Sequence, residues 1–271
     1  MQDYGAGVFE GAFTKSALKK AIKQGRVEVN DSLASTATYI HEGDRISLFP
    51  EVIISQSKQL VFPLKVLFED EYLAVIHKPA GILVSGNGFK TIARALTQNL
   101  QESQLSDATK PQPIHRLDYA TTGTLLVGKA SRSIRLLNKL FEEHKIKKTY
   151  YAVAIGEMRM QGKINSEIEG KDSRSSYQVL DTVTSERFGK LNLLQLNLET
   201  GRRHQLRKHL SSIGHPILGD QAYGIDGLIL KRKGLYLHAF SLAFEHPFTQ
   251  EKLHVSDELP PKFGSMFNLN P

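Results

Sequence analysis

The chain has 271 residues, of which 40% are hydrophobic, and no apolar run approaches the roughly 18 residues that a membrane-spanning helix needs. It has no cysteine, which excludes disulfides, thiolate catalysis and cysteine-ligated zinc. Lysine and arginine total 35 against 28 acidic residues, and this net charge of +7 favours a polyanionic partner, nucleic acid first. The first residues show no secretory signal, so we expect a cytoplasmic protein.

Residues 1–50 are predicted to form a small unit that begins with a helix. Thr14 is positioned to cap this helix, which continues as KSALKKAIKQ and ends at Gly25. A strand at 26–29 and a second strand at 45–48 follow it. The lysines of this helix lie off its apolar face. They are either solvated or bind phosphate groups. Four cations of this unit are candidate RNA contacts: Lys15, Lys19, Lys23 and Arg26.

Residues 51–64 are predicted to be a linker, and residues 65–271 a larger domain. Strands outnumber helices there and do not alternate with them regularly. This pattern favours an α+β fold with a mixed, largely antiparallel central sheet flanked by helices. Residues 101–113 are polar and contain proline, so we expect a loop. The expected elements are strands at 72–77, 124–128, 149–156, 191–199 and 235–244 and helices at 91–100, 131–144 and 204–213.

The strand expected at 191–199 is rich in leucine but does not alternate regularly. Its apolar pattern changes phase between Leu193 and Leu194. Either a β-bulge or burial of the strand on both faces would account for this change.

Residues 113–128, PIHRLDYATTGTLLVG, place a lone acid in a polar turn that runs directly into a short apolar strand. Arg116 lies two positions before this acid, Asp118, and a neighbouring cation favours the charged form of a carboxyl group. A charged carboxylate on a turn at the end of a rigid strand is suited to chemistry on a ligand. The alternative is that Asp118 only caps the turn through a hydrogen bond to the backbone.

Two further segments carry groups suited to nucleotides. In KKTYYA, residues 147–152, alternation along a strand puts Tyr150 and Tyr151 on opposite faces, so only one of them can face a given cleft. That tyrosine is either a stacking surface for a base or a core residue. In TGRRHQLR, residues 200–207, we expect Arg203 and Arg207 to share a helix face. One of these arginines is then able to pair with Asp118 if the helix meets the turn.

No pattern in the chain predicts a metal or a nucleotide cofactor. The ten histidines do not form an HExxH arrangement, and neither a P-loop nor a GxGxxG motif is present. Asp220 follows a glycine in an expected turn and is not assigned a catalytic role.

In chain order, HRLDYATTG, KKTYYA, LETGRRHQLRKHL and GHPILGDQAYG resemble the motifs of the RluA family of pseudouridine synthases. The resemblance extends from about residue 65 to about residue 255. At the start of the chain, GRVEVND and HEGDRISL resemble a small S-four-like RNA-binding domain, truncated because its usual opening helix is missing.

The RluA resemblance implies isomerisation of uridine to pseudouridine in ribosomal or transfer RNA, without a cofactor or a metal. It implies that Asp118 is the catalytic carboxylate, acting as a nucleophile or as a base, that Tyr150 stacks on the target base and that Arg207 pairs with Asp118. Arg116 matches the arginine that helps to flip the nucleotide, and His115 and Arg203 are further candidate RNA contacts. We expect a monomer. The alternatives are a non-catalytic RNA-binding or ribosome-assembly factor and, less favoured, a metal-dependent RNA hydrolase.

Overall fold

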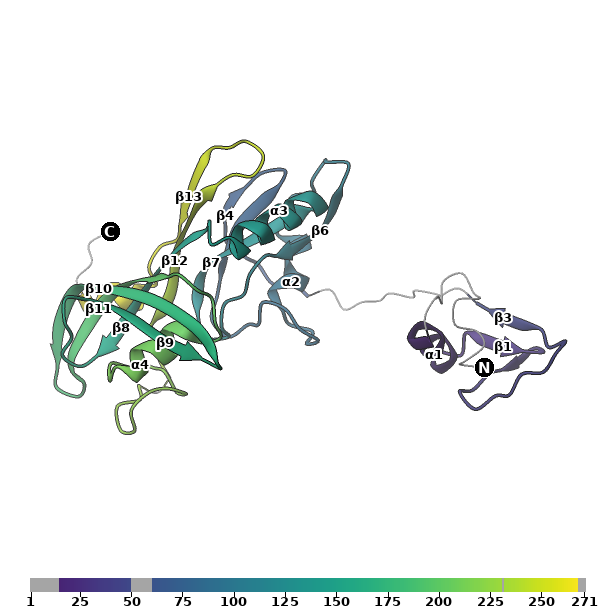
Figure 1. Cartoon of the computed structure of the whole chain (residues 1–271), viewed down its shortest axis with the longest axis horizontal. Coiled ribbons are helices and arrows are strands. Elements are labelled where there is room, and N and C mark those ends of the chain that lie inside the picture. The colour runs from purple at the N-terminus through teal and green to yellow at the C-terminus, as the bar shows by residue number, and fades with distance from the viewer. Residues whose placement is uncertain (1–14, 50–59, 231, 268–271) are drawn as a thin grey trace. The chain divides into compact units, whose positions relative to one another are not determined.

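The computed structural model describes residues 15–49, 60–230 and 232–267 of the chain, shown in Figure 1. These residues form two compact units, one that ends by Gln59 and one that begins at Leu60. Most of the predicted linker, as well as the expected cap Thr14, lies outside the described residues. None of the described helices is both long enough and apolar enough to cross a membrane.

The first unit is a short helix beside a three-stranded antiparallel sheet. The helix is α1 (Lys15–Lys23), and the strands are β1 (Val27–Val29), β2 (Ser32–Leu33) and β3 (Ile46–Leu48), in the order β2-β1-β3. Leu18, Ala21 and Ile22 of α1 are buried, as the helical spacing of its apolar residues predicts. The predicted helix and its two strands are therefore confirmed, and β2 is an additional short strand.

The second unit is built on one ten-stranded sheet, whose path is β4-β5-β7-β12-β8-β11-β10-β9, with β6 paired to β7 and β13 to β12. The β7–β12 pairing is parallel, and all the other pairings of this sheet in the described residues are antiparallel. The predicted α+β class with a mixed, largely antiparallel sheet is confirmed. The strands are β4 (Val66–Glu69), β5 (Leu73–Lys78), β6 (Ala108–Pro113), β7 (Thr122–Ala130), β8 (Lys147–Ile155), β9 (Gln161–Ile168), β10 (Lys171–Ser185), β11 (Gly189–Leu198), β12 (Leu237–Glu245) and β13 (Lys252–Ser256).

Helices cover this sheet. They are α2 (Ile92–Ala95), the 3-10 helix η1 (Leu96–Gln98), α3 (Ser131–Glu142), α4 (Gln205–Ser212) and α5 (Pro261–Phe267). The helix expected at 91–100 is in fact α2 followed by η1, and the side chain of Thr91 caps it by accepting a hydrogen bond from the backbone N–H of Arg94. Leu137 of α3 packs with Leu73 and Val75 of β5, so α3 covers one face of the sheet.

The prediction of a loop over residues 101–113 is wrong for its second half. Residues Ala108–Pro113 form β6, which among the described strands pairs only with β7. Pro111 and Pro113 led to the loop prediction, because proline has no backbone N–H to donate to a neighbouring strand. Proline is tolerated in β6 because this strand, in the described part of the chain, has a partner strand on one side only.

The irregular leucine pattern of β11 has a clear structural origin. Leu191, Leu193 and Leu194 are all buried, so this part of β11 is covered on both faces. The bulge lies on the partner strand β10, where Val179 pairs with Leu194 and Asp181 with Leu193. Burial on both faces therefore explains the sequence pattern of β11 itself.

A single glycine permits the contact that brings β12 against the start of β7. Gly123 has a φ of +116°, and a Cβ atom there would lie 2.1 Å from the carbonyl oxygen of Ala239 in β12. Only glycine avoids both the strain and the collision. Because residues 118–121 lead directly into this point, the close approach fixes where the Asp118 turn leaves the sheet.

Candidate active site

Asp118 lies on the turn before β7, and the buried side chain of Lys78 forms hydrogen bonds with the backbone of this turn. The backbone N–H of Thr121 donates to the Asp118 carbonyl oxygen at 3.1 Å. Lys78, at the end of β5, is fully buried, and its Nζ donates to the carbonyl oxygens of Pro79, Tyr119 and Thr121 at 3.0, 3.4 and 2.8 Å. Burial lowers the pKa of Lys78 to about 8, against the opposing effect of the Asp118 charge. Lys78 therefore fixes the backbone that follows Asp118, at Tyr119 and Thr121.

Arg207 of α4 connects Asp118 to a second carboxylate. Its Nε and Nη2 donate to Oδ2 and Oδ1 of Asp220 at 2.7 and 2.8 Å, while Nη1 lies 3.4 Å from Oδ2 of Asp118. Asp220 also accepts hydrogen bonds from the backbone N–H groups of Ala222 and Tyr223. Burial alone would raise the pKa of Asp220, but the bonds from Arg207 and from the backbone hold it below its ordinary value. Asp220 thus orients the guanidinium that faces Asp118.

The prediction that Arg203 and Arg207 share a helix face is wrong. Helix α4 begins at Gln205, and His204 before it has the left-handed backbone φ of 57°. The side-chain oxygen of Gln205 accepts the backbone N–H of Arg202, which keeps the preceding loop out of the helix. Arg203 is consequently exposed on this loop, at the edge of the cavity that contains Asp118.

His204 is a member of the site that sequence reasoning considered only as a metal ligand. Its Nε2 lies 3.6 Å from Oδ1 of Asp118, and its Nδ1 is 2.9 Å from the hydroxyl oxygen of Tyr223. Burial, together with the charges of Arg207 and Arg203, lowers the pKa of His204 more than Asp118 raises it. No signal along the sequence links His204 to Asp118, because their contact arises only from the tertiary fold.

The structure selects Tyr150, rather than Tyr151, for the cavity that contains Asp118. Tyr150 of β8 is 7% exposed and lines this cavity, whereas Tyr151 packs edge-on against Phe240 with ring centroids 4.7 Å apart. Burial, and then the charge of Asp118, raises the pKa of Tyr150. The phenol therefore stays protonated at neutral pH and presents an uncharged ring.

The two residues just before the Asp118 turn differ in their surroundings. The ring of His115 stacks on Phe141 at 4.8 Å, and its Nε2 accepts the backbone N–H of Leu126 at 3.0 Å. Burial lowers the pKa of His115 to about 3, so the ring is neutral at pH 7. Arg116 is exposed and makes no ion pair with Asp118 in the described structure. Asp118 therefore contacts Arg207, one of the two arginines that the sequence offered as its partner, and not Arg116, which precedes it in the chain.

These groups meet around one cavity of about 300 Å³, a volume at the lower end of the range for small-molecule sites. We call it the Asp118 cavity. Of the predicted site residues, six line it: His115, Arg116, Asp118, Tyr150, Arg203 and Arg207. The other four belong to the first unit, where three exposed lysines lie on α1 and Arg26 bonds to the carbonyl oxygen of Phe49. Within the described residues, no three metal-ligating side chains gather into a cluster.

Comparison with known proteins gives a consistent result. The family described as RNA pseudouridylate synthase matches residues 72–212. Ribosomal large subunit pseudouridine synthase D of Nitrosomonas europaea is 33% identical, over 94% of this chain and 79% of its own length. An uncharacterized RNA pseudouridine synthase of Aquifex aeolicus is 31% identical, over 94% of this chain and 89% of its own length.

Solved structures agree in fold. Human RNA pseudouridylate synthase domain containing 4 aligns with a TM-score of 0.60 and 25% identity, covering 73% of this chain and 90% of that one. Human RNA pseudouridylate synthase domain containing 1 gives a TM-score of 0.61 at 24% identity, over 74% of this chain and 85% of that one.

Proposed function

Because the chain belongs to the RluA family of RNA pseudouridine synthases, we propose that Asp118 is the carboxylate with which it isomerises uridine to pseudouridine. The observation that carries this assignment is the meeting of Asp118, Tyr150 and Arg207 around one cavity, although they come from three distant segments. Membership of an isomerase family also removes the reason to favour a non-catalytic factor or a metal-dependent hydrolase.

The chemistry needs an ionised carboxylate next to the sugar of the target nucleotide. The bond between ribose C1′ and uracil N1 breaks, the uracil turns, and its C5 bonds to C1′, so C5 loses a proton and N1 gains one. Asp118 assists by attacking C1′ or by removing a proton from C2′, and both routes use its charged form. The guanidinium of Arg207, oriented by Asp220, lies 3.4 Å from Oδ2 of Asp118 and so places a positive charge next to this carboxylate.

The uridine must leave its base stack before it reaches Asp118, which costs a few kcal/mol. Tyr150 offsets part of this cost by stacking on the extruded uracil. Arg116, exposed at the edge of the same cavity, is suited to fill the space that the flipped nucleotide leaves. Arg203 and His115 are the remaining contacts on this side. The hydrogen bond from Leu126 already occupies Nε2 of His115, so we assign His115 to shaping the cavity wall.

The substrate is ribosomal RNA of the large subunit. Several similar proteins carry the name ribosomal large subunit pseudouridine synthase D, at about 30% identity over most of this chain. Ribosomal RNA is therefore favoured over transfer RNA, the other substrate that the sequence suggests. We place the protein in the cytoplasm, where ribosomal RNA is its substrate. We propose that it acts as a monomer, since the site described above is formed within one chain.

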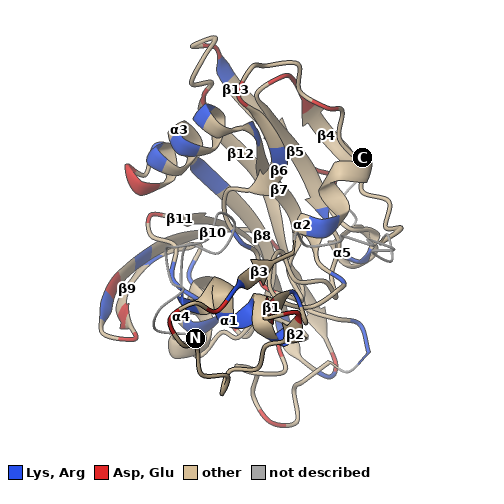
Figure 2. Cartoon of the chain, turned by 90° about the vertical axis from the view of Figure 1, so that its right-hand side faces the viewer, with Lys and Arg blue, Asp and Glu red and all other residues tan. Residues whose placement is uncertain are grey.

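The first unit adds affinity for RNA without taking part in the reaction. We assign residues 1–50 to an S-four-like RNA-binding domain, residues 51–64 to a linker and residues 65–271 to catalysis. The cations Lys15, Lys19, Lys23 and Arg26 contact phosphate groups. Figure 2 colours the basic residues of α1 and the other elements blue.

The test is an assay with the purified chain on two unmodified transcripts, large-subunit ribosomal RNA and transfer RNA, both labelled with tritium at uracil C5. We expect tritium release and mapped pseudouridines in the ribosomal transcript only. Release from transfer RNA alone would refute the substrate assignment, and release from neither would refute the activity.

A further inference from the structure

A second cavity, of about 430 Å³, adjoins the Asp118 cavity. The two are neighbours, because Lys148 and Leu198 line both of them. The wall of the second cavity comes from the loop after α3, the start of β8, the strand β10 and the end of β11. We call it the flanking groove; the residues that matter below are Lys147, Lys148, Arg174, Asn197, Glu199 and Thr200.

The flanking groove carries an excess of positive charge. Lys147, Lys148 and Arg174 line it, against the single carboxylate of Glu199. Neither lysine makes an ion pair with a carboxylate of the described chain, and Arg174 makes only a 3.7 Å contact from its Nε to Asp172. Both side chains of that pair are largely exposed, and exposed pairs contribute little. The three cations are thus open to an anionic ligand.

Lys148 is the most informative of the three. It is partly buried between the two cavities, and its Nζ lies 5.6 Å from the centre of the Phe141 ring. Burial lowers the pKa of Lys148, and no described carboxylate opposes this effect. A partly desolvated ammonium without a counter-ion is stabilised when an anion arrives.

The wall between the two cavities is held by a closed set of hydrogen bonds. Thr200 Oγ1 accepts the backbone N–H of Arg174 at 3.0 Å and donates to the side chain of Gln205 at 2.8 Å. Gln205 Nε2 in turn donates to the carbonyl oxygen of Arg174 at 2.9 Å. Nearby, Oδ1 of Asn197 is buried without a hydrogen-bond partner among the described residues. These bonds fix the shape of the groove before a ligand binds. The side-chain oxygen of Asn197 is still able to accept a hydrogen bond.

A uridine that enters the Asp118 cavity brings its two phosphodiester groups with it, and these remain close to the cavity's edge. We infer that the flanking groove binds the phosphodiester backbone of the RNA strand next to the flipped uridine, with Lys147, Lys148 and Arg174 as its phosphate contacts. This inference rests on the proposed function, because it takes the Asp118 cavity as the uridine site. Figure 2 shows further basic residues along α3, whose C-terminal end leads to the groove.

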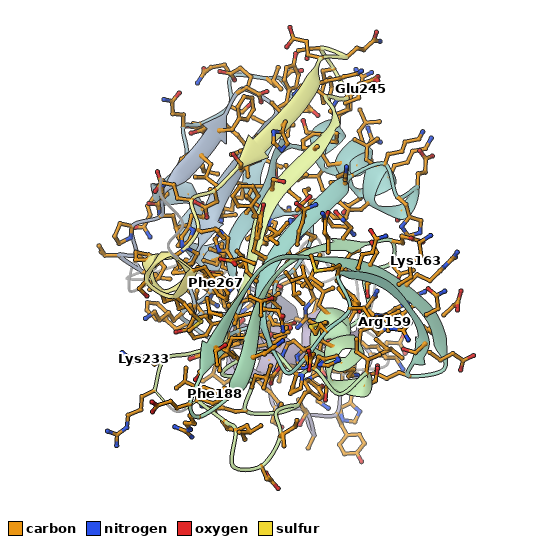
Figure 3. The ribbon with its side chains drawn as sticks, turned by 90° about the vertical axis from the view of Figure 1, so that its left-hand side faces the viewer. Arg159, Lys163, Phe188, Lys233, Glu245 and Phe267 are labelled. Carbon is orange, nitrogen blue, oxygen red and sulfur yellow. The ribbon has the colours of Figure 1, made fainter. Side chains whose placement is uncertain are left out.

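The test compares two double variants that each remove two exposed positive charges. K147A/R174A changes the flanking groove but spares Lys148, which also lines the Asp118 cavity. R159A/K233A is the matched control, because neither Arg159 nor Lys233 lines either cavity; Figure 3 labels both residues. Both variants and the unchanged chain are tested with the unmodified large-subunit ribosomal RNA transcript for the salt dependence of binding, KM and single-turnover rate at saturating RNA.

For K147A/R174A we expect the slope of log affinity against log salt to flatten by about 1.4, which is about 0.7 for each phosphate of a single strand that the variant no longer neutralises. We expect KM to rise at least tenfold while the single-turnover rate stays unchanged. R159A/K233A should match the unchanged chain in all three quantities.

Equal slopes and equal KM values for the two double variants would overturn the inference, and so would a flatter slope with an unchanged KM. The proposed function fails separately, if the unchanged chain forms no pseudouridine. Even then, the salt slopes still decide whether the groove binds RNA phosphates.

Discussion

At the scale of single residues, Arg207 divides its guanidinium between two carboxylates of different kinds. Asp220 is completely buried and takes two short hydrogen bonds, whereas Asp118 is 18% exposed and receives one longer contact. The strong pair fixes the cation, and the weak pair leaves oxygens of Asp118 free for substrate. A carboxylate with two strong bonds to arginine would be a poorer nucleophile or base, because its lone pairs would be occupied.

Asp220→Asn tests this division of roles. The substitution leaves Arg207 buried with one distant carboxylate, so we expect a loss of about 3 kcal/mol in the free energy of unfolding. Because the guanidinium is then misplaced next to Asp118, single-turnover pseudouridine formation should fall by about 10–100-fold with little change in KM. Urea unfolding and single-turnover kinetics measure the two effects. The control is Asp226→Asn, on an exposed turn; if both substitutions behave alike, Asp220 has no orienting role.

Sequence reasoning singled out residues that stand within a motif and missed those defined by contact alone. Asp118, Tyr150 and Arg207 were proposed as site residues, because each stands within a segment with its own chemical pattern. Lys78 was not proposed, since a lysine in a strand gives no sign that its ammonium will bond to two carbonyl oxygens of a distant turn. Asp220 was discounted because it follows a glycine in a turn, and its partner lies 13 residues away.

At the scale of elements, the junction of β7 and β12 decides where the Asp118 turn lies. This parallel pairing involves only two residue pairs, with Thr122 and Gly123 opposite His238 and Ala239. It brings late strand β12 between β7 and β8, and so places the turn before β7 near Tyr150 of β8.

Gly123→Ala should therefore damage both the fold and the site. The added methyl meets the Ala239 carbonyl, and a φ of +116° is strained for any residue with a Cβ, so we expect a loss of at least about 2 kcal/mol in stability. Thermal unfolding measures it. Gly88→Ala is the matched control, since a Cβ at Gly88 meets nothing within 4 Å. A melting temperature like that of the control would show that the strands separate without cost.

Elements whose buried positions hold apolar residues were predicted well, and elements that bury polar residues were missed. The strand β10 buries Ser173 and Ser175, which form hydrogen bonds with both ring nitrogens of His209 at 2.9 and 2.6 Å. Its sequence consequently shows no run of alternating apolar residues at these positions. Arg203 was wrongly placed on a face of α4 for a related reason: the side-chain oxygen of Gln205 accepts the backbone N–H of Arg202, and this polar contact sets where the helix begins.

At the scale of the whole molecule, buried neutral histidines connect the stability of the second unit to pH. His238 is fully buried; its Nδ1 lies 2.8 Å from Thr122 Oγ1, and its Nε2 lies 3.7 Å from Asp257. Burial lowers the pKa of His238 to about 4, against the attraction of Asp257 and with smaller contributions from His77 and Lys262. Between pH 6.5 and pH 4 the unfolded chain binds a proton at this residue that the folded chain does not. Stability therefore falls as the pH falls through this range.

His238→Gln should remove this part of the pH dependence. Glutamine does not titrate, so between pH 7 and pH 4.5 the variant should lose about 2 kcal/mol less unfolding free energy than the unchanged chain. Urea unfolding at the two pH values measures this difference, and the exposed His254→Gln is the control. A loss for His238→Gln as large as that of the control variant would contradict the role given to His238.

The fold class was predictable because strand patterns outnumber helical ones along the chain, but the order of the strands was not. That order depends on long-range pairings such as β7 with β12, which only the packed sheet reveals. The convergence of three motifs on one cavity also depends on long-range packing. The family resemblance implied it, and in the structure Asp118, Tyr150 and Arg207 line the same cavity.

The most direct measurement for the central claim is pseudouridine formation by Asp118→Asn on the ribosomal transcript, with RNA binding measured in parallel. Asparagine keeps the size of the side chain and removes its charge, so we expect tritium release to fall below detection while the RNA dissociation constant stays within about threefold of the unchanged chain. Turnover by Asp118→Asn at a substantial fraction of the original rate would contradict the assignment of Asp118 as the catalytic carboxylate.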